Sequence, residues 1–147
     1  MEIVGHYRIE ASREKVWNRL LDPEVLRSCI PGCRQLSVND VDSYDATVKL
    51  KLGPVSATFA ATVEINDIEA PRRCRLVGKS NDRIAGFAKG ECVVDLQEVE
   101  GSTSLTYRAT TEIGGKICVL GSRLIQATSR KLADQFFAEF ARLLSRV

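Results

Sequence analysis

The spacing of hydrophobic positions changes twice along the chain. Residues 2–10 are strand-like, and Ser12 then stands where a helix N-cap is expected, just before apolar residues at helical spacing. Asp22 and Pro23 predict a second short helix, because aspartate caps a helix and proline at its first position loses no needed N–H. Pro31-Gly32 ends that helix. The N-terminal part therefore predicts one strand followed by two short helices.

From Arg34 to Ile113 the period is two residues, which is typical of strands with one buried face. The clearest alternation consists of Val55, Ala57, Phe59, Ala61, Val63 and Ile65. Turn residues at Gly53-Pro54, Ala70-Pro71 and Glu100-Gly101-Ser102 divide the region into strands. No crossover helix separates these strands, so we expect an antiparallel sheet with one apolar face.

After Gly114-Gly115 the period returns to that of a helix. The apolar stripe consists of Leu120, Leu124, Ile125, Leu132, Phe136, Phe140, Leu143 and Leu144. It predicts one helix of about 25 residues, more than 35 Å long at ~1.5 Å per residue. Gly121 falls early in this helix, and we expect something to approach it closely, because glycine costs a helix up to about 1 kcal/mol.

The long helix is the only large cover for the apolar face of the sheet. We therefore predict an α+β fold in which a curved antiparallel sheet of about seven strands surrounds the C-terminal helix, with two short helices after the first strand. The chain has 147 residues, which suits a single domain over residues 1–147.

Composition narrows the class of protein. The net charge is only +2, which argues against nucleic-acid binding. No apolar run is long enough to cross a bilayer, and the start of the sequence does not look like a signal peptide. We therefore expect a cytoplasmic globular protein.

Residues for catalysis or metal binding are sparse. The five cysteines are Cys29, Cys33, Cys74, Cys92 and Cys118, and the one histidine is His6. Cys29 and Cys33 have neither a second ligand pair for zinc nor the spacing of a redox Cys-x-x-Cys motif, although a redox role for them stays open. We expect no metal site, no tightly bound cofactor and no catalytic residues, because the inward positions offer neither a histidine nor paired carboxylates.

Many inward strand positions carry small residues, which would leave volume beneath the helix. They are Ala46, Ala57, Ala61, Gly78, Ala88, Gly90 and Ala109. The alternatives are a filled core and an apolar cavity. If a cavity forms, we expect its lining to include Val48, Leu50, Phe59, Ala61, Leu76, Phe87, Cys92, Tyr107, Ala109, Leu120, Gly121, Leu124, Leu132 and Phe136.

Two of these residues have a further predicted role. Glycines at 86 and 90 allow a bulge that could turn the Phe87 ring over the cavity. The Tyr107 hydroxyl needs a partner and could donate a hydrogen bond to a ligand carbonyl.

Short stretches in a fixed order carry a resemblance to a known family. They are Asp22-Pro23-Glu24-Val25-Leu26, Cys29-Ile30-Pro31-Gly32-Cys33, Leu52-Gly53-Pro54-Val55, Ala85-Gly86-Phe87-Ala88-Lys89-Gly90, Gly114-Gly115-Lys116, Leu120-Gly121-Ser122-Arg123-Leu124-Ile125 and Lys131-Leu132-Ala133-Asp134-Gln135-Phe136-Phe137. The ordered set spans nearly the whole chain. It resembles the CoxG family of carbon monoxide dehydrogenase subunits, within the helix-grip superfamily of START and birch-pollen-allergen proteins (SRPBCC).

The resemblance implies a non-catalytic accessory protein that binds a respiratory quinone or another lipid-like molecule in its cavity. It also implies association with a molybdenum hydroxylase of the carbon monoxide dehydrogenase type and transient contact with the inner face of the membrane. Several family members carry a membrane-engaging C-terminal extension, whereas this sequence ends at Arg146-Val147, so the resemblance favours ligand binding over anchoring. A polyketide-cyclase-like enzyme and a docking factor without a small ligand are the alternatives.

Overall fold

The computed structural model describes residues 2–82 and 86–145. Its strands are β1 (Glu2–Ile9), β2 (Cys33–Asp40), β3 (Ser43–Leu52), β4 (Val55–Glu69), β5 (Arg73–Asp82), β6 (Gly86–Val99) and β7 (Ser102–Gly114). Its helices are α1 (Arg13–Leu20), α2 (Pro23–Cys29), the 3-10 helix η1 (Gly115–Leu120) and α3 (Ser122–Ser145).

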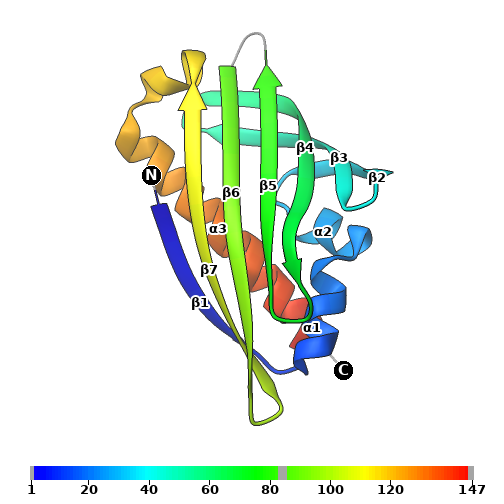
Figure 1. Ribbon diagram of the computed structural model, residues 1–147. Helices are drawn as coiled ribbons and strands as arrows, with labels where there is room; N and C mark the ends of the chain where they lie inside the picture. Colours follow the sequence, from blue (N-terminus) through cyan, green and yellow to red (C-terminus); the bar gives the residue numbers. More distant parts are fainter. Residues whose placement is uncertain (1, 83–85, 146–147) are drawn as a thin grey trace.

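The strands form one antiparallel sheet in the order β1-β7-β6-β5-β4-β3-β2. Helix α3 runs diagonally across the inner face of the curved sheet, and α1 and α2 lie near the C-terminal end of α3 (Figure 1). The predicted α+β architecture of a curved sheet around a long C-terminal helix is confirmed.

Local side chains define the two short helices as predicted. Ser12 caps α1, because its Oγ accepts a hydrogen bond from the Lys15 N–H at 3.3 Å. Asp22 caps α2 through an Oδ1 contact of 3.0 Å with the Glu24 N–H, and Pro23 occupies the first turn. These contacts satisfy N–H groups that a helix start leaves unpaired.

The helix expected after Gly114-Gly115 is divided in two, which corrects the prediction for Gly121. That glycine separates η1 from α3 with φ 89° and ψ 150°, a backbone conformation open essentially only to glycine. A Cβ placed on Gly121 would meet no atom within 4 Å, so the expected close approach was wrong. Glycine is needed here for backbone direction, and Leu120 lies in η1 rather than in the long helix.

Packing is uneven along α3. The larger core cluster gathers residues of α1, α2, the sheet and the C-terminal half of α3, and it includes Trp17 and Phe140. Within it, the rings of Tyr107 and Phe137 stack at 4.3 Å between centroids. Among the described residues, the smaller cluster has Phe59 and Ile117 as its buried members. The end of the molecule near α1 is therefore filled by large side chains, and the end near η1 is filled more thinly.

The absence of a side chain at Gly5 lets β1 pair closely with β7 beside the Tyr107 ring. Gly5 pairs with Tyr107 across the strands, and a Cβ at Gly5 would lie only 2.3 Å from Cε1 of the Tyr107 ring. Gly78 is also a strand glycine, yet a Cβ there would meet no atom within 4 Å. The two positions therefore differ in the space that they offer.

We expect Gly5→Ala to lower the free energy of unfolding by about 1–3 kcal/mol, because the added methyl group overpacks the Tyr107 ring. Gly78→Ala should instead leave stability unchanged or raise it by up to about 1 kcal/mol, since alanine loses less backbone entropy on folding. Denaturant titration of both variants measures the difference. Equal destabilisation of the two would contradict the packing described here.

Candidate functional site

An apolar cavity of about 260 Å³ lies between the sheet and the N-terminal half of α3. Its lining is Val48, Leu50, Phe59, Ala61, Gly78, Lys79, Ser80, Ala88, Lys89, Gly90, Thr111, Ile113, Ile117, Ile125, Thr128, Ser129 and Leu132. It falls at the thinly packed end of the core, where the smaller cluster of Phe59 and Ile117 forms part of its wall.

Small residues on neighbouring strands create this space. Gly78 pairs with Gly90, and Ser80 pairs with Ala88, so four small residues lie together on β5 and β6. Helix α3 cannot approach to fill the gap, because its larger side chains pack against the aromatic residues at the other end. The sequence left two alternatives, a filled core and an apolar cavity, and the structure contains the cavity.

The structure brings together only part of the predicted lining. Val48, Leu50, Phe59, Ala61 and Leu132 line the cavity. Leu76, Cys92, Tyr107, Ala109 and Phe136 belong to the larger core cluster instead. Leu120 packs against the smaller cluster, Leu124 lines a neighbouring groove, and Gly121 and Phe87 are exposed. The sequence pattern identified the correct face of the sheet, but it did not locate the unfilled part of that face.

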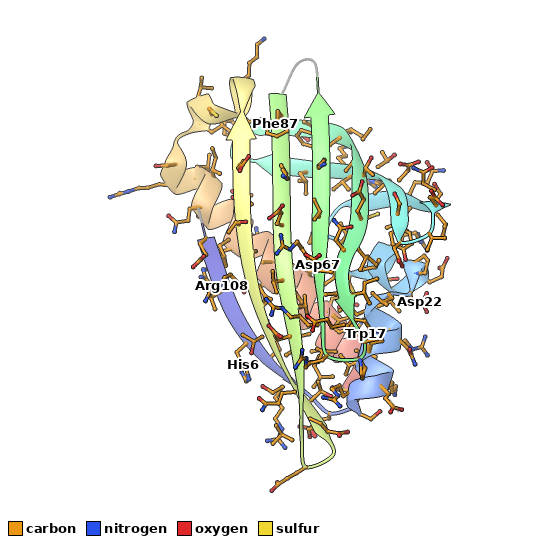
Figure 2. The ribbon with its side chains drawn as sticks, in the orientation of Figure 1. His6, Trp17, Asp22, Asp67, Phe87 and Arg108 are labelled. Carbon is orange, nitrogen blue, oxygen red and sulfur yellow. The ribbon has the colours of Figure 1, made fainter. Side chains whose placement is uncertain are left out.

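Phe87 does not turn over the cavity. The pairing of β6 with β5 and β7 is continuous through Phe87, which lies opposite Asn81 and Gly114, so the expected bulge was wrong. Since Ala88 faces the cavity, Phe87 points to the other side of the sheet, and its side chain is 40% exposed. Figure 2 shows it at the end of the sheet farthest from Trp17.

The lining that the prediction missed includes hydroxyl groups. Oγ1 of Thr111 is buried and has no hydrogen-bond partner among the described residues. Oγ of Ser80 differs, because it donates to the Ala60 carbonyl at 3.0 Å. Strand alternation places Thr111 on the inner face, and its polar side chain there was the available signal. A buried hydroxyl without a partner favours a ligand that carries a hydrogen-bonding oxygen.

Both lysines beside the cavity belong to the outer face. Lys79 pairs with Lys89, and the residues on either side of each lysine belong to the inner face of the sheet. Because successive strand residues face opposite sides, the two ammonium groups project away from the cavity. Lys89 lies 3.5 Å from Glu91, on the outer face. The cavity wall formed by the described residues is therefore uncharged.

A groove continues from the cavity toward solvent. It shares Leu50, Thr128 and Leu132 with the cavity and adds residues of the β3–β4 turn and of α3. The turn packs closely on α3, since a Cβ at Gly53 would lie 2.8 Å from Cδ2 of Leu124. The groove therefore lies directly beside the cavity, between β3 and α3.

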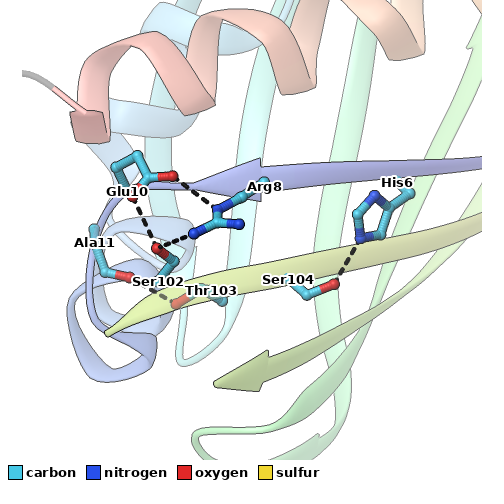
Figure 3. Close-up of polar contacts among 7 residues, drawn as sticks. All are labelled: His6, Arg8, Glu10, Ala11, Ser102, Thr103 and Ser104. Atoms are coloured by element: carbon cyan, nitrogen blue, oxygen red, sulfur yellow. Dashed lines mark hydrogen bonds and ion pairs between the residues drawn. The ribbon is translucent and has the colours of Figure 1, made fainter. Parts of the chain in front are cut away.

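A second group of polar residues joins β1 to β7 near the hairpin of β6 and β7 (Figure 3). His6 Nε2 lies 2.6 Å from Ser104 Oγ, and Ser102 Oγ donates to Glu10 at 2.8 Å. Hydrogen bonds from Ser102 and Arg8 lower the pKa of the exposed Glu10 carboxyl. His6 is exposed on the sheet, and among the described residues no third group contacts its Nδ1 to orient the ring as a catalytic base would require. These contacts stabilise the pairing of the edge strand β1 with β7.

The cysteines are poor candidates for chemistry. Burial raises the pKa of the Cys29 thiol to about 11 and that of Cys92 to about 12, which disfavours the reactive thiolate. Cys33 is half-buried, and burial also raises the pKa of its thiol. Within residues 2–82 and 86–145, no three metal-ligating side chains gather at one place. The sequence left a redox role for Cys29 and Cys33 open, and the raised pKa values of both thiols disfavour it.

Comparison with known proteins gives a family and a fold. Residues 5–145 match the model of the CoxG family, which is described as a subunit of carbon monoxide dehydrogenase. A conserved protein from Geobacillus kaustophilus has a similar structure with a TM-score of 0.91 and 28% identity, covering 99% of this chain and 96% of the other. A comparison with curated proteins finds no match. No described helix is long and apolar enough to span a membrane.

Two more distant structures show likeness of fold alone. Ara h 8.0201 has a TM-score of 0.67 and 14% identity, covering 99% of each chain. The di-domain ARO/CYC BexL from the BE-7585A biosynthetic pathway has a TM-score of 0.64 and 16% identity, covering all of this chain and 50% of its own.

Tyr107 and Tyr44 provide a matched pair of buried phenols. The Tyr107 hydroxyl has no partner among the described residues, whereas Tyr44 donates to the Leu21 carbonyl at 3.1 Å. We expect Tyr107→Phe to raise the free energy of unfolding at neutral pH by about 1 kcal/mol, and Tyr44→Phe to lower it by about the same amount. Chemical denaturation of both variants measures this. A loss of stability in Tyr107→Phe would show that its hydroxyl has a partner.

The same variant has an expected pH dependence. Burial raises the pKa of the Tyr107 phenol from 10.0 to about 12, so the folded state favours the neutral form. That contribution to stability is complete below pH 10 and is lost as the pH rises through 12. Tyr107→Phe should therefore lose less stability over this range than the unmodified protein does. Parallel curves of stability against pH would contradict the burial of Tyr107.

Proposed function

The chain belongs to the CoxG family of carbon monoxide dehydrogenase subunits, and we propose that it is a non-catalytic carrier of an apolar ligand. In this proposal the ligand is a respiratory quinone or another lipid-like molecule, held between the sheet and α3. The protein serves a molybdenum hydroxylase of the carbon monoxide dehydrogenase type, on the cytoplasmic side of the membrane.

The observation that supports this proposal is the uncharged cavity at the thinly packed end of α3. Enclosing roughly 300 Å² of apolar ligand surface contributes about 7 kcal/mol at ~25 cal/mol per Å². This gain alone corresponds to a dissociation constant of about 10 μM before the loss of freedom on association is subtracted, so micromolar affinity requires that a tail bury further apolar surface in the groove beside the cavity. Such binding needs no ion pair with the ligand.

Size and polarity favour a ring with oxygen substituents. An apolar cavity of roughly 150 Å³ holds benzene, and the space here is about 260 Å³. A quinone ring fits such a volume, and its carbonyl can accept a hydrogen bond from Thr111. A long isoprenoid tail exceeds the cavity and would leave through the groove beside Leu124.

A polyketide-cyclase-like enzyme is the second candidate, and the likeness of fold to the ARO/CYC protein favours it. A cyclase needs groups that move protons at the substrate. The described lining offers the hydroxyls of Ser80, Thr111, Thr128 and Ser129, with both neighbouring lysines turned outward. This composition supports binding more than catalysis.

The direct test is titration of detergent-free protein with short-tailed and long-tailed quinones, with complexes counted by native mass spectrometry. Displacement of an environment-sensitive dye gives the affinity. Trp17 is a poor reporter, because it lies in the larger core cluster near α1 (Figure 2) and does not line the cavity. Stoichiometric micromolar binding supports the carrier, and absence of binding to both kinds of quinone overturns it.

Gly78→Leu should weaken quinone binding about tenfold or more, because the new side chain would occupy the empty space in front of β5. Gly78→Ala adds a single methyl group and is the matched control, with affinity close to that of the unmodified protein. Thermal unfolding checks that both variants fold. Unchanged affinity in a folded Gly78→Leu variant would place the ligand elsewhere.

Thr111→Val should weaken binding of a quinone about 3- to 10-fold, because valine has the same shape but removes the hydroxyl. It should leave unchanged the binding of an isoprenoid hydrocarbon that lacks oxygen. Thr110→Val is the control, since Thr110 is the exposed neighbour on the opposite face of β7. Equal losses for quinone and hydrocarbon would exclude a hydrogen bond from Thr111.

A further inference from the structure

Strand β2 lies at an edge of the sheet, where an apolar side chain is left uncovered. Among the described residues β2 pairs on one side only, with β3, because it stands last in the strand order (Figure 1). Val38 lies opposite Tyr44, which is buried in the core, so Val38 belongs to the inner face of the sheet. It is nevertheless 62% exposed, whereas Ile3 on the other edge strand is buried. The inner face at β2 therefore ends in an apolar residue that the rest of the chain does not cover.

The sequence of β2 lacks two residues that commonly prevent pairing at a sheet edge. Edge strands are often protected by lysine or proline, and β2 contains neither. Its regular pairing with β3 runs from Gln35 to Val38, with a register shift on each side. Such irregularities shorten the part of an edge that can pair. A short stretch of open edge therefore remains.

The residues of β2 complement one another when two copies of the strand run in opposite directions. An antiparallel pair centred on Ser37 matches residues of related chemistry. The opposed residues are Arg34 and Asp40, Gln35 and Asn39, and Leu36 and Val38. Opposite charges, two amides and two apolar side chains are favourable cross-strand pairs.

Neighbouring registers lose this complementarity. Centring the pair on Leu36 sets Arg34 opposite Val38, and centring it on Val38 sets Leu36 opposite Asp40. Each of these registers places a charge against an apolar side chain. The pattern of β2 therefore favours one register, and it favours a second copy of the same strand as the partner.

Arg34 and Asp40 are available for such a contact. Both side chains are exposed, and no ion pair among the described residues includes either of them. Oδ1 of Asp40 accepts a hydrogen bond of 2.7 Å from the Val41 N–H. The other carboxylate oxygen can therefore accept a hydrogen bond from an arginine.

We propose that two copies of the chain form a dimer by antiparallel pairing of β2 with β2 about Ser37, which joins the two sheets edge to edge. A two-fold interface contains each contact twice, so Leu36 and Val38 of both copies form one apolar cluster that covers Val38. The interface is small, and we expect a dissociation constant on the order of 100 μM. The dimer does not depend on the ligand proposed above.

A second copy fits this edge better than a strand of another protein. Any extended segment can pair with the free backbone groups of an edge strand. A second copy also supplies the opposite charge, the amide and the apolar side chain at the matching positions. Pairing with a different protein is therefore an outcome that the experiment must distinguish.

The test is sedimentation velocity of the full chain from about 1 μM to about 500 μM, because a dimer of this strength forms by mass action over that range. We expect the mass to rise from 16.2 kDa toward twice that value. A monomer at every concentration overturns the dimer, and in that case the edge is free for a different protein.

Val38→Lys should weaken association about tenfold or more, because it places two ammonium groups in the apolar cluster. Val119→Lys is the matched control, since it adds the same charge at an exposed valine on η1, and its association should change less than about twofold. Thermal unfolding checks that both variants fold. Equal association in the two variants would place the dimer interface elsewhere.

A charge swap tests the register. Arg34→Asp sets carboxylates opposite each other at both ends of the interface, so it should weaken association about tenfold. Arg34→Asp with Asp40→Arg restores opposite charges, and association should return to within about threefold of that of the unmodified protein. Arg34→Asp with Glu98→Arg has the same net charge but places the arginine on β6, so association should stay weak. A swap that does not restore association overturns the proposed pairing.

Cross-linking gives a second test of the register. In Ser37→Cys the two new thiols face each other, so mild oxidation with oxidised glutathione should link two copies through a disulfide. In Gln35→Cys each new thiol faces Asn39, and we expect little linkage. Both variants also carry Cys118→Ser, which removes an exposed native thiol. Equal linkage at the two positions would show random collision and would overturn the dimer centred on Ser37.

Discussion

The packing of one long helix against a curved sheet is the constraint on which this structure depends. Helix α3 contacts the sheet closely where Phe137 stacks on Tyr107 with 4.3 Å between ring centroids. That contact sets the distance between helix and sheet near α1, where large side chains fill the core. A stiff helix held there cannot also close on the small residues near Gly78, so stability and empty volume occur at opposite ends of the same helix.

This division separates the tasks of the two ends. Substitutions near α1 act on stability, because close-packed side chains there have no room to adjust. The end of the molecule near η1 contains the cavity, and its wall is uncharged. In that wall the Thr111 hydroxyl is buried and has no described hydrogen-bond partner. Lys116, Val119 and Arg123 are exposed on the surface of the same end. The empty volume and the buried hydroxyl thus lie where the core contributes least to stability.

Local signals explain why the elements were predictable. Ser12, Asp22 and Pro23 act within a few residues of themselves, so caps and helix starts follow from sequence. Both Glu100 and Gly101 have positive φ, 49° and 84°, in the short hairpin that their sequence indicates. Gly121 shows the limit of such reasoning. A glycine among helical residues suggests close packing. At Gly121 the backbone instead turns between two helices, and the spacing of hydrophobic residues gives no information about the φ angle.

The sequence by itself determined the order of elements, the antiparallel sheet with one apolar face, and the presence of small residues on that face. Only the tertiary structure decided whether those residues leave volume and where that volume lies. Leu76 and Cys92 share the inner face with Gly78 and Ala61, yet the first two are packed and the second two line the cavity. Alternation assigns a side chain to a face, whereas the filling of that face depends on which residues of α3 stand opposite, through contacts distant in sequence.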